Sequence, residues 1–591
     1  MGLAGISVYR WAGLNPGKKL WVFRNHQCAF IDSISVSEPQ STNGCSSSCS
    51  NTGPPKCKMQ QPTTYLATDS ASTRDLGWRW KQTSVFQKLG IPGPKPSLIF
   101  GNILELYKKG PIKCHEEWVK KYGRVLGYYY GMKPVLLVTN PYLLKDIFIK
   151  DFNKFINRET FTPIHEYDPK NPKGQSVLIL PGQAWKDVRS ILTPTFTVAK
   201  MKQLAGSINS SIDNMLDVLQ ERAQKGKDFD IFDIYQRLTM DVITKTAFGM
   251  QTDVQKNPKS RLLRATKLIF MANYKDPIIF VALVFPLLRK LCVKVQEFLI
   301  TLMNNGTFPH TMCIRGIKKV IEMRRKNSEA KTKDLLQLML DSSIVVETTE
   351  TDVSKLEAGN TEVEKLEAEK KETTDKKIRK MTEEEIESSA FTVLLAGYET
   401  TSTALGFTTY LLARHQDVQE KLYQEIKELM ERGEKLEYAA INKLPYLDKV
   451  LNESLRMYPP VHLFTNRFAG EDVQYGDIQI PKGTLIQAPV HLMHHDPEFW
   501  SEPEIFDPER FNTKPNANGI TYLPFGVGPR NCLGMRLAQL EAKLAVAHII
   551  SKFHLKLGER HKDKFLVMNR IRTLSPQKGV YVKLEPRSGD T

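Results

Sequence analysis

A loop near the C-terminus constrains the fold more than any other part of this chain. Residues 525–534 read FGVGPRNCLG, and the amphipathic stretch 535–544 follows at once. Glycine and proline make the chain turn there, while the apolar residues that follow recur at helical spacing. The loop therefore delivers Cys532 to the start of a helix. Backbone N–H groups and the helix dipole lower the pKa of a thiol at that position.

A thiolate held in this way has a specific chemical use. It is a good axial ligand for haem iron and promotes O–O cleavage. Gly526, Gly528 and Gly534 would let the backbone approach a flat ring closely, and Arg530 could pair with a haem propionate. The alternative is a lone buried cysteine in a turn, which is common in proteins. These residues by themselves leave both interpretations open.

Helical patterns dominate the rest of the chain. The segment 90–96, GIPGPKP, forms a stiff boundary, because proline fixes φ and biases the preceding residue to extended geometry. From about residue 86 to 587 the sequence predicts one folded domain. Short apolar runs at 135–138, 477–480 and 484–487 are typical of strands, with 481–483 as the turn between the last two.

Two segments are unlike that domain. Residues 1–85 are largely disordered in our interpretation, because 33–64 are rich in Ser, Thr, Pro, Gln and Gly without any period. The sparse acidic residues before Asp32 leave a mitochondrial presequence open as an alternative. Residues 347–380 contain almost only Glu, Lys, Thr, Asp and Ala, which predicts a charged, disordered insertion.

Charge and hydropathy exclude some classes of protein. Hydrophobic residues make up 41% of the chain, which excludes global disorder. No apolar run reaches the length of a membrane-spanning helix. The apolar run 277–288 is too short to cross a bilayer, so it suits a buried segment or one that dips into a membrane interface. The net charge of +18 favours an anionic membrane, an acidic protein partner or nucleic acid.

The loop also carries a family resemblance. Its pattern, Phe-x-x-Gly-x-Arg-x-Cys-x-Gly, resembles the haem-binding signature of the cytochrome P450 superfamily, and chance would produce it about once in ten thousand chains of this length. The resemblance implies haem b as the cofactor and Cys532 as the axial ligand of the iron. It also implies that Phe525, Arg530 and Gly534 line the haem.

Further motifs of that family occur in the expected order. Glu453 and Arg456 resemble the Glu-x-x-Arg pair of the K helix, and Arg510 supplies the third member of a buried structural cluster. Trp185 and Arg189 resemble a Trp-x-x-x-Arg pair that grips the propionates. The family implies two more basic contacts: Arg158, and either Arg467 or His462.

The segment 396–401, AGYETT, resembles the family's distal I-helix motif. Ala396 would face the haem, and Gly397 would weaken the helical ladder so that O2 and water fit beside it. Thr400 would hydrogen-bond the activated oxygen and Glu399 would relay protons, which makes these two the predicted catalytic residues. A threonine in a helix is, however, often only bonded back to a carbonyl.

The resemblance implies a mainly α fold with small β-sheets and a long central helix. It is closest to the family-three clan of animal enzymes that oxidise drugs and steroids, and it implies an invertebrate member. The implied activity is monooxygenation of a lipophilic substrate by O2. A lipid-peroxide isomerase or dehydratase, or a non-catalytic haem protein, remains the alternative.

The implied partners are an NADPH-dependent cytochrome P450 reductase, with cytochrome b5 as a second candidate donor, and a membrane surface. Nucleic acid is not expected, because no binding motif accompanies the charge. The implied location is the cytoplasmic face of the endoplasmic reticulum, with a mitochondrial or soluble form as the alternative. The transmembrane anchor of microsomal members is not recognisable in this sequence.

Overall fold

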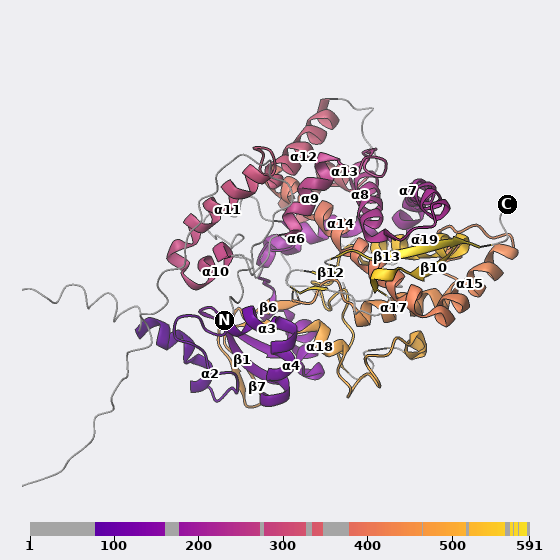
Figure 1. Cartoon of the computed structure of the whole chain (residues 1–591). Helices are drawn as coiled ribbons and strands as arrows, with labels where there is room; N and C mark the ends of the chain where they lie inside the picture. Colours follow the sequence, from indigo (N-terminus) through magenta and orange to yellow (C-terminus); the bar gives the residue numbers. More distant parts are fainter. Residues whose placement is uncertain are drawn as a thin grey trace, which may run out of the picture. The chain divides into compact units, whose positions relative to one another are not determined.

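A long central helix organises the domain (Figure 1). Helix α14 (Glu383–Arg414) has 32 residues and is therefore about 48 Å long. A capping box fixes its start: the Thr382 hydroxyl accepts a hydrogen bond from the Glu385 N–H at 3.2 Å, and the Glu385 carboxylate accepts one from the Thr382 N–H at 3.0 Å. Most of its side chains are buried, because α8, α12, α17 and α19 pack around it.

The computed structural model describes the domain with short gaps. Mainly helical architecture with small sheets is confirmed. The described residues are 77–159, 176–271, 277–326, 334–346, 377–463, 465–513, 515, 519–561, 568–570, 573–576 and 578–587. The helices are α2 (Val85–Lys88), α3 (Ile103–Lys109), α4 (Pro111–Tyr122), α5 (Pro141–Lys145), α6 (Gly182–Leu192), α7 (Val198–Gln224), α8 (Ile231–Phe248), α9 (Arg261–Met271), α10 (Pro277–Val284), α11 (Arg289–Met303), α12 (Pro309–Lys326), α13 (Leu335–Asp341), α14, α15 (Gln416–Glu431), α16 (Tyr438–Ile441), α17 (Pro445–Met457), α18 (Val490–His494) and α19 (Met535–Lys552).

The strands form small sheets. The largest has the order β1-β2-β9-β6, in which β2 runs parallel to β9 and the other neighbours are antiparallel. A second sheet has the order β10-β13-β3, and β10 and β13 lie side by side in yellow in Figure 1. The strands are β1 (Val125–Tyr130), β2 (Lys133–Val138), β3 (Phe229–Asp230), β4 (Ser343–Val346), β5 (Lys377–Lys380), β6 (Asn466–Phe468), β7 (Val473–Tyr475), β8 (Ile478–Ile480), β9 (Leu485–Gln487), β10 (Phe553–Leu557), β11 (Met568–Arg570), β12 (Leu574–Pro576) and β13 (Tyr581–Pro586).

The proline-rich boundary packs against the largest sheet. The Gly127 N–H of β1 donates to the Pro92 carbonyl at 2.8 Å. A Cβ atom on Gly93 would lie 1.9 Å from the Gly127 carbonyl oxygen, so only glycine fits there. The stiff segment therefore belongs to the folded domain.

Both atypical segments are partly ordered at their edges. Residues 77–83 are helical, and in α2 the buried Phe86 donates its N–H to the Tyr129 hydroxyl at 3.0 Å, so order begins before residue 86. At the end of the expected insertion, β5 pairs with β4, because the hydrogen bonds of a strand pair do not require apolar side chains. Residues 1–76 and 347–376 lie outside the described residues.

The run 277–288 divides into a covered and an exposed part. Ile279, Ala282 and Val284 of α10 are buried, whereas the Leu287 side chain is 97% exposed. Among the described residues, no helix has both the length and the apolar character that a membrane span requires.

Candidate functional site

Turn geometry places Cys532 at the start of α19. The Cys532 N–H donates to the Phe525 carbonyl at 2.7 Å, which closes the loop back on its beginning. Gly528 has a positive φ of 70°, and a Cβ atom there would lie 2.1 Å from the Phe148 carbonyl oxygen. No other residue fits that position, so Gly528 sets how closely the loop packs on its neighbours.

Opposing effects act on the Cys532 thiol. The residue keeps solvent-accessible surface, but the surrounding protein is dense enough that burial raises the pKa of the thiol above its ordinary value. A hydrogen bond from the Gly534 N–H and the charges of Arg189 and Arg158 lower that pKa in part. The expectation of a lowered thiol pKa is therefore wrong for the protein alone. Desolvation of the thiolate raises the pKa more than the groups at the helix start lower it.

The arginines predicted to hold the propionates lie together around this loop. Arg158 donates to the Arg530 carbonyl at 2.9 Å. Arg189 donates to the carbonyl and side-chain oxygens of Asn531 at 3.0 and 2.7 Å. The Arg530 guanidinium lies 4.3 Å from the centre of the Trp185 ring. The structure thus brings Arg158, Trp185, Arg189 and Arg530 to the Cys532 loop.

Arg467 joins this arginine cluster. Arg467 is fully buried on β6 and donates to the Val527 carbonyl of the loop at 3.3 Å. Burial, with the charges of Arg158 and Arg530, holds its pKa well below the ordinary value. His462 lines a small cavity with His115 and His491 instead.

The arginine cluster comprises Arg158, Arg189, Arg467 and Arg530, and it concentrates positive charge at the Cys532 loop. Burial and mutual repulsion lower the pKa of Arg158 to about 10 and that of Arg530 to about 8. Within the described residues no carboxylate forms an ion pair with any of the four guanidinium groups. The buried Nε atoms of Arg158, Arg467 and Arg530 have no hydrogen-bond partner. Such a cluster fits a ligand with two carboxylates beside the thiol, as haem has.

Thr400 and Ala396 form a second group on α14. The Thr400 hydroxyl donates to the Ala396 carbonyl at 2.7 Å. Ala396 is exposed and Thr400 is half-buried, although most of α14 is buried. A Cβ atom on Gly397 would lie 2.7 Å from Ile243 Cδ1 of α8. Close helix packing thus accounts for Gly397, and the expected back-bonded threonine is present.

Glu399 lies on the buried side of α14. Its side chain is only 4% exposed. Burial raises the pKa of Glu399 to about 7, although hydrogen bonds with Gln236 and Thr573 and the charge of Lys267 oppose the rise. A carboxyl group that titrates near neutrality can hold a proton and release it.

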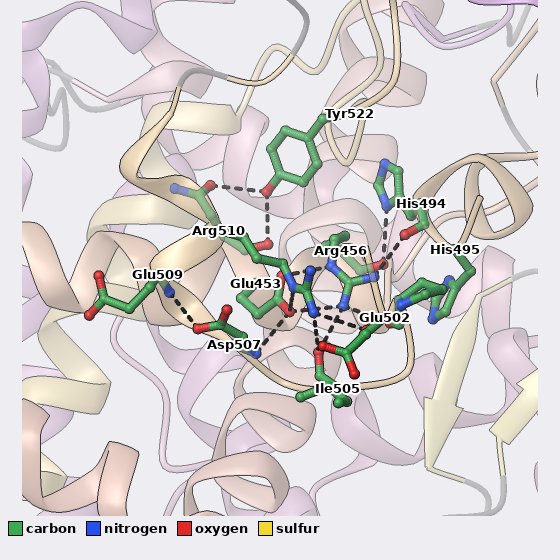
Figure 2. A network of polar contacts seen from close by, with 12 residues as sticks. Glu453, Arg456, His494, His495, Glu502, Ile505, Asp507, Glu509, Arg510 and Tyr522 are labelled. Carbon is green, nitrogen blue, oxygen red and sulfur yellow. Dashed lines mark hydrogen bonds and ion pairs between the residues drawn. The ribbon is translucent and has the colours of Figure 1, made fainter. Parts of the chain in front are cut away.

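The predicted structural cluster forms as expected (Figure 2). Glu453 and Arg456 of α17 are fully buried, and the guanidinium donates to both carboxylate oxygens at 2.6 and 2.8 Å. Arg510 adds a contact of 3.3 Å to Glu453. Arg456 also donates to the His494 carbonyl at 2.8 Å, and His494 Nε2 accepts the Leu523 N–H at 2.9 Å, just before the Cys532 loop.

Sequence reasoning missed the polar residues around Glu399. Gln236 and Lys267 belong to α8 and α9, far from α14 in the chain. A polar Gln236 inside the largely buried stretch of α8 was the available signal. Asn531, which anchors Arg189, was also missed, because a loop position gives no periodic signal.

A cysteine at a helix start, beside an unneutralised arginine cluster in a helical domain, defines a haem-thiolate protein. The chain belongs to the cytochrome P450 family, whose model matches residues 91–584. It is 34% identical to cytochrome P450 3A5 of Homo sapiens over 510 residues, or 85% of this chain and 93% of that protein. It is 34% identical to cytochrome P450 3A6 of Oryctolagus cuniculus, with the same coverage.

Another relative is named thromboxane-A synthase, from Sus scrofa. It is 34% identical over 524 residues, which cover 86% of this chain and 95% of that protein. The matches to cytochromes P450 3A5 and 3A6 confirm the likeness to family three. The chain is a cytochrome P450 monooxygenase, and its cofactor is thiolate-ligated haem. An invertebrate source stays a prediction.

Proposed function

We propose that this monooxygenase inserts one oxygen atom of O2 into a lipophilic xenobiotic, steroid or lipid, with electrons from an NADPH-dependent reductase. The observation that carries the proposal is the arginine cluster beside Cys532, in which Arg467 and Arg530 are buried and with which no carboxylate of the described residues forms an ion pair. Cytochrome b5 is a second candidate donor. The surplus of basic residues, 83 against 65 acidic ones, favours an acidic donor.

The residues have separate roles in this proposal. Cys532 is the iron ligand, and the bound haem supplies O–O cleavage and the oxidising power. Phe525 and Gly534 shape the loop that presents the sulfur, with the Cys532 N–H tied to Phe525. Arg158, Arg189, Arg467 and Arg530 hold the propionates, and Trp185 supports Arg530 through its ring.

Proton supply is the role proposed for α14. The Thr400 hydroxyl, now bonded to Ala396, can rotate to donate to the reacting oxygen. Glu399 replaces the proton, which its pKa of about 7 allows near neutral pH. Glu453, Arg456 and Arg510 have a structural role in the proposal, because their contacts join α17 to the segment before the Cys532 loop.

The second candidate is a haem-thiolate isomerase or dehydratase of lipid peroxides. Similarity to the relative named thromboxane-A synthase is the reason to consider this second candidate. Such chemistry needs no proton relay, so a buried Glu399 next to Thr400 argues for the monooxygenase.

Spectra and coupling test the proposal. The reduced carbon-monoxide complex should show the red-shifted Soret band of thiolate ligation, and Cys532→Ser should lose it. With reductase and NADPH, Thr400→Ala should consume NADPH, release peroxide and form less product. An imidazole-type spectrum in the unaltered protein, or unchanged coupling in Thr400→Ala, would refute the assigned roles. Turnover of a peroxide without NADPH would support the isomerase.

A membrane surface at the endoplasmic reticulum is proposed as the setting. On α11, the exposed side chains Leu291, Phe298 and Leu302 recur at seven- and four-residue steps, which places them on one helix face. Lys290 and Lys294 lie beside them in the sequence. An apolar face flanked by cations favours an anionic lipid interface.

A further inference from the structure

One face of α8 carries polar side chains toward Glu399. Asp233, Gln236, Thr239 and Ile243 follow at steps of three or four residues, so they share a face of the helix. This face meets α14, because the Thr239 hydroxyl donates to the Tyr398 carbonyl at 2.8 Å. The Ile243 side chain fills the space beside Gly397 in the same contact.

Gln236 occupies the next turn of that face. It is 9% exposed, and its amide hydrogen-bonds with Glu399 in the contact between the two helices. Thr573, which precedes β12, adds a second hydrogen bond. Glu399 is therefore held from two elements besides its own.

The outer end of the same face reaches a cation on α9. Lys267 Nζ lies 2.6 Å from Asp233 Oδ1, and Arg237 lies 3.0 Å from the other oxygen. The side chains of Lys267 and Asp233 are 34% and 35% exposed, so the pair lies between the buried acid and solvent. Burial acts to raise the pKa of Asp233, but Lys267 and Arg237 lower it overall, which keeps the ion pair formed.

We propose that Lys267, held by its ion pair with Asp233, is a positioning residue for the acid Glu399, and that Gln236 orients the Glu399 carboxyl. The inference rests on the proposed function, in which Glu399 supplies the proton to the reacting oxygen. Among the described residues, Lys267 acts on the charge of this acid, Asp233 forms an ion pair with Lys267, and Tyr398 is the titratable neighbour on α14 itself. A cation at this place favours the ionised carboxyl and so makes the proton easier to release.

The sign of the effect follows from that charge. A proton donor must be protonated. The coupling of NADPH use to product formation should therefore fall as the pH rises through about 7, the pKa of Glu399. Lys267→Met lacks the cation, so the pKa of Glu399 rises. The fall in coupling then moves to higher pH. Asp233→Asn removes the ion pair that holds Lys267 in place, so the fall in coupling moves in the same direction, by a smaller amount. Because Lys267 is partly exposed, we expect shifts of about half a pH unit to one pH unit.

The experiment has two readouts on the haem-loaded protein. Infrared difference titration follows the carboxyl C=O band, which Glu399→Gln assigns, and coupling of NADPH to product is measured across pH with reductase. Lys267→Arg should restore the unaltered profile, because it keeps the cation. Lys245→Met is the matched control, since Lys245 forms an ion pair with Asp241 within α8 at 2.9 Å.

Shifts to higher pH in Lys267→Met and, by less, in Asp233→Asn, with Lys245→Met unchanged, would support the inference. If Glu399→Gln lowers coupling while Lys267→Met leaves both the infrared titration and the pH profile unchanged, the inference is overturned. If Glu399→Gln leaves coupling unchanged, the proposed proton donor fails instead. Low yield of one variant does not obscure the result, because Lys267→Met and Asp233→Asn each predict a shift that is measured separately.

Discussion

Arg456→Met should be among the most destabilising single substitutions in this protein. The guanidinium donates to two Glu453 oxygens and to the His494 and Pro503 carbonyls, each at 2.6–2.8 Å and with Arg456 fully buried. Its removal leaves Glu453 with Arg510 at 3.3 Å and the Asp507 N–H at 3.1 Å. Breaking a buried ion pair costs about 3–5 kcal/mol, and each stranded carbonyl adds about 1 kcal/mol or more.

The total, about 5 kcal/mol or more, is a large part of the stability of an ordinary domain. Urea unfolding at neutral pH measures it, with coincidence of fluorescence and circular dichroism as the test for a two-state transition. The Trp500 ring lies 5.4 Å from the guanidinium and reports on this region. Arg510→Met should cost less, about 1–2 kcal/mol, because it makes the longer contact.

Lys421→Met is the matched control on an ion pair at the surface. The Lys421 side chain is 59% exposed in its pair with Glu509, and such pairs contribute below about 1 kcal/mol. The reasoning is wrong if Arg456→Met loses no more stability than Lys421→Met, or if Arg510→Met loses more than Arg456→Met.

Three further predictions use other parts of the domain. Arg467→Leu should release haem to apomyoglobin faster than the unaltered protein does. His462→Leu should not, because Arg467 joins the arginine cluster and His462 lines a separate cavity. Equal rates of haem release in the two variants would refute the assignment. Burial raises the pKa of Glu541 well above the ordinary 4.5, so the folded state retains a proton that the unfolded chain releases, and stability falls as the pH rises above 4.5. Glu541→Gln should therefore gain stability over the unaltered protein by about 1.4 kcal/mol per pH unit from that point up to the folded-state pKa; parallel curves of unfolding free energy against pH would contradict this. Phe298→Ser should weaken binding to anionic phospholipid vesicles about tenfold, as measured by sedimentation. Ile505→Ser should not weaken it, although Ile505 is also an exposed side chain, because it lies away from α11. Equal losses of binding in the two variants would argue against the α11 face.

Local patterns predicted much of the candidate site. The Cys532 loop, the Thr382 capping box and the Glu453–Arg456 pair all act within a few residues, so spacing alone sets their geometry. The sign of the pKa shift at Cys532 was not predictable in this way, because burial depends on residues far away in the chain. The choice between Arg467 and His462 likewise depended on which of them reaches Arg158 and Arg530.

Sheet topology gives another example of this division. The short runs at β8 and β9 are strands, as their composition predicts, yet β8 pairs with β7 while β9 lies between β2 and β6. The turn between them therefore joins two different sheets. Alternating side chains indicate that a strand exists, but its partner depends on contacts over long distances in sequence.

By itself, the sequence determined the class of protein, the place of Cys532 in a loop at the start of a helix, the start of α14 and the Glu453–Arg456 pair of α17. These follow from residue types at fixed local spacing. Only the tertiary structure decided that Gln236, Lys267 and Thr573, on three separate segments, gather around Glu399. It also decided that an arginine cluster, with no carboxylate ion pair among the described residues, lies at the Cys532 loop. The physical reason is that burial and electrostatic fields sum over neighbours in space, and helix packing chooses those neighbours.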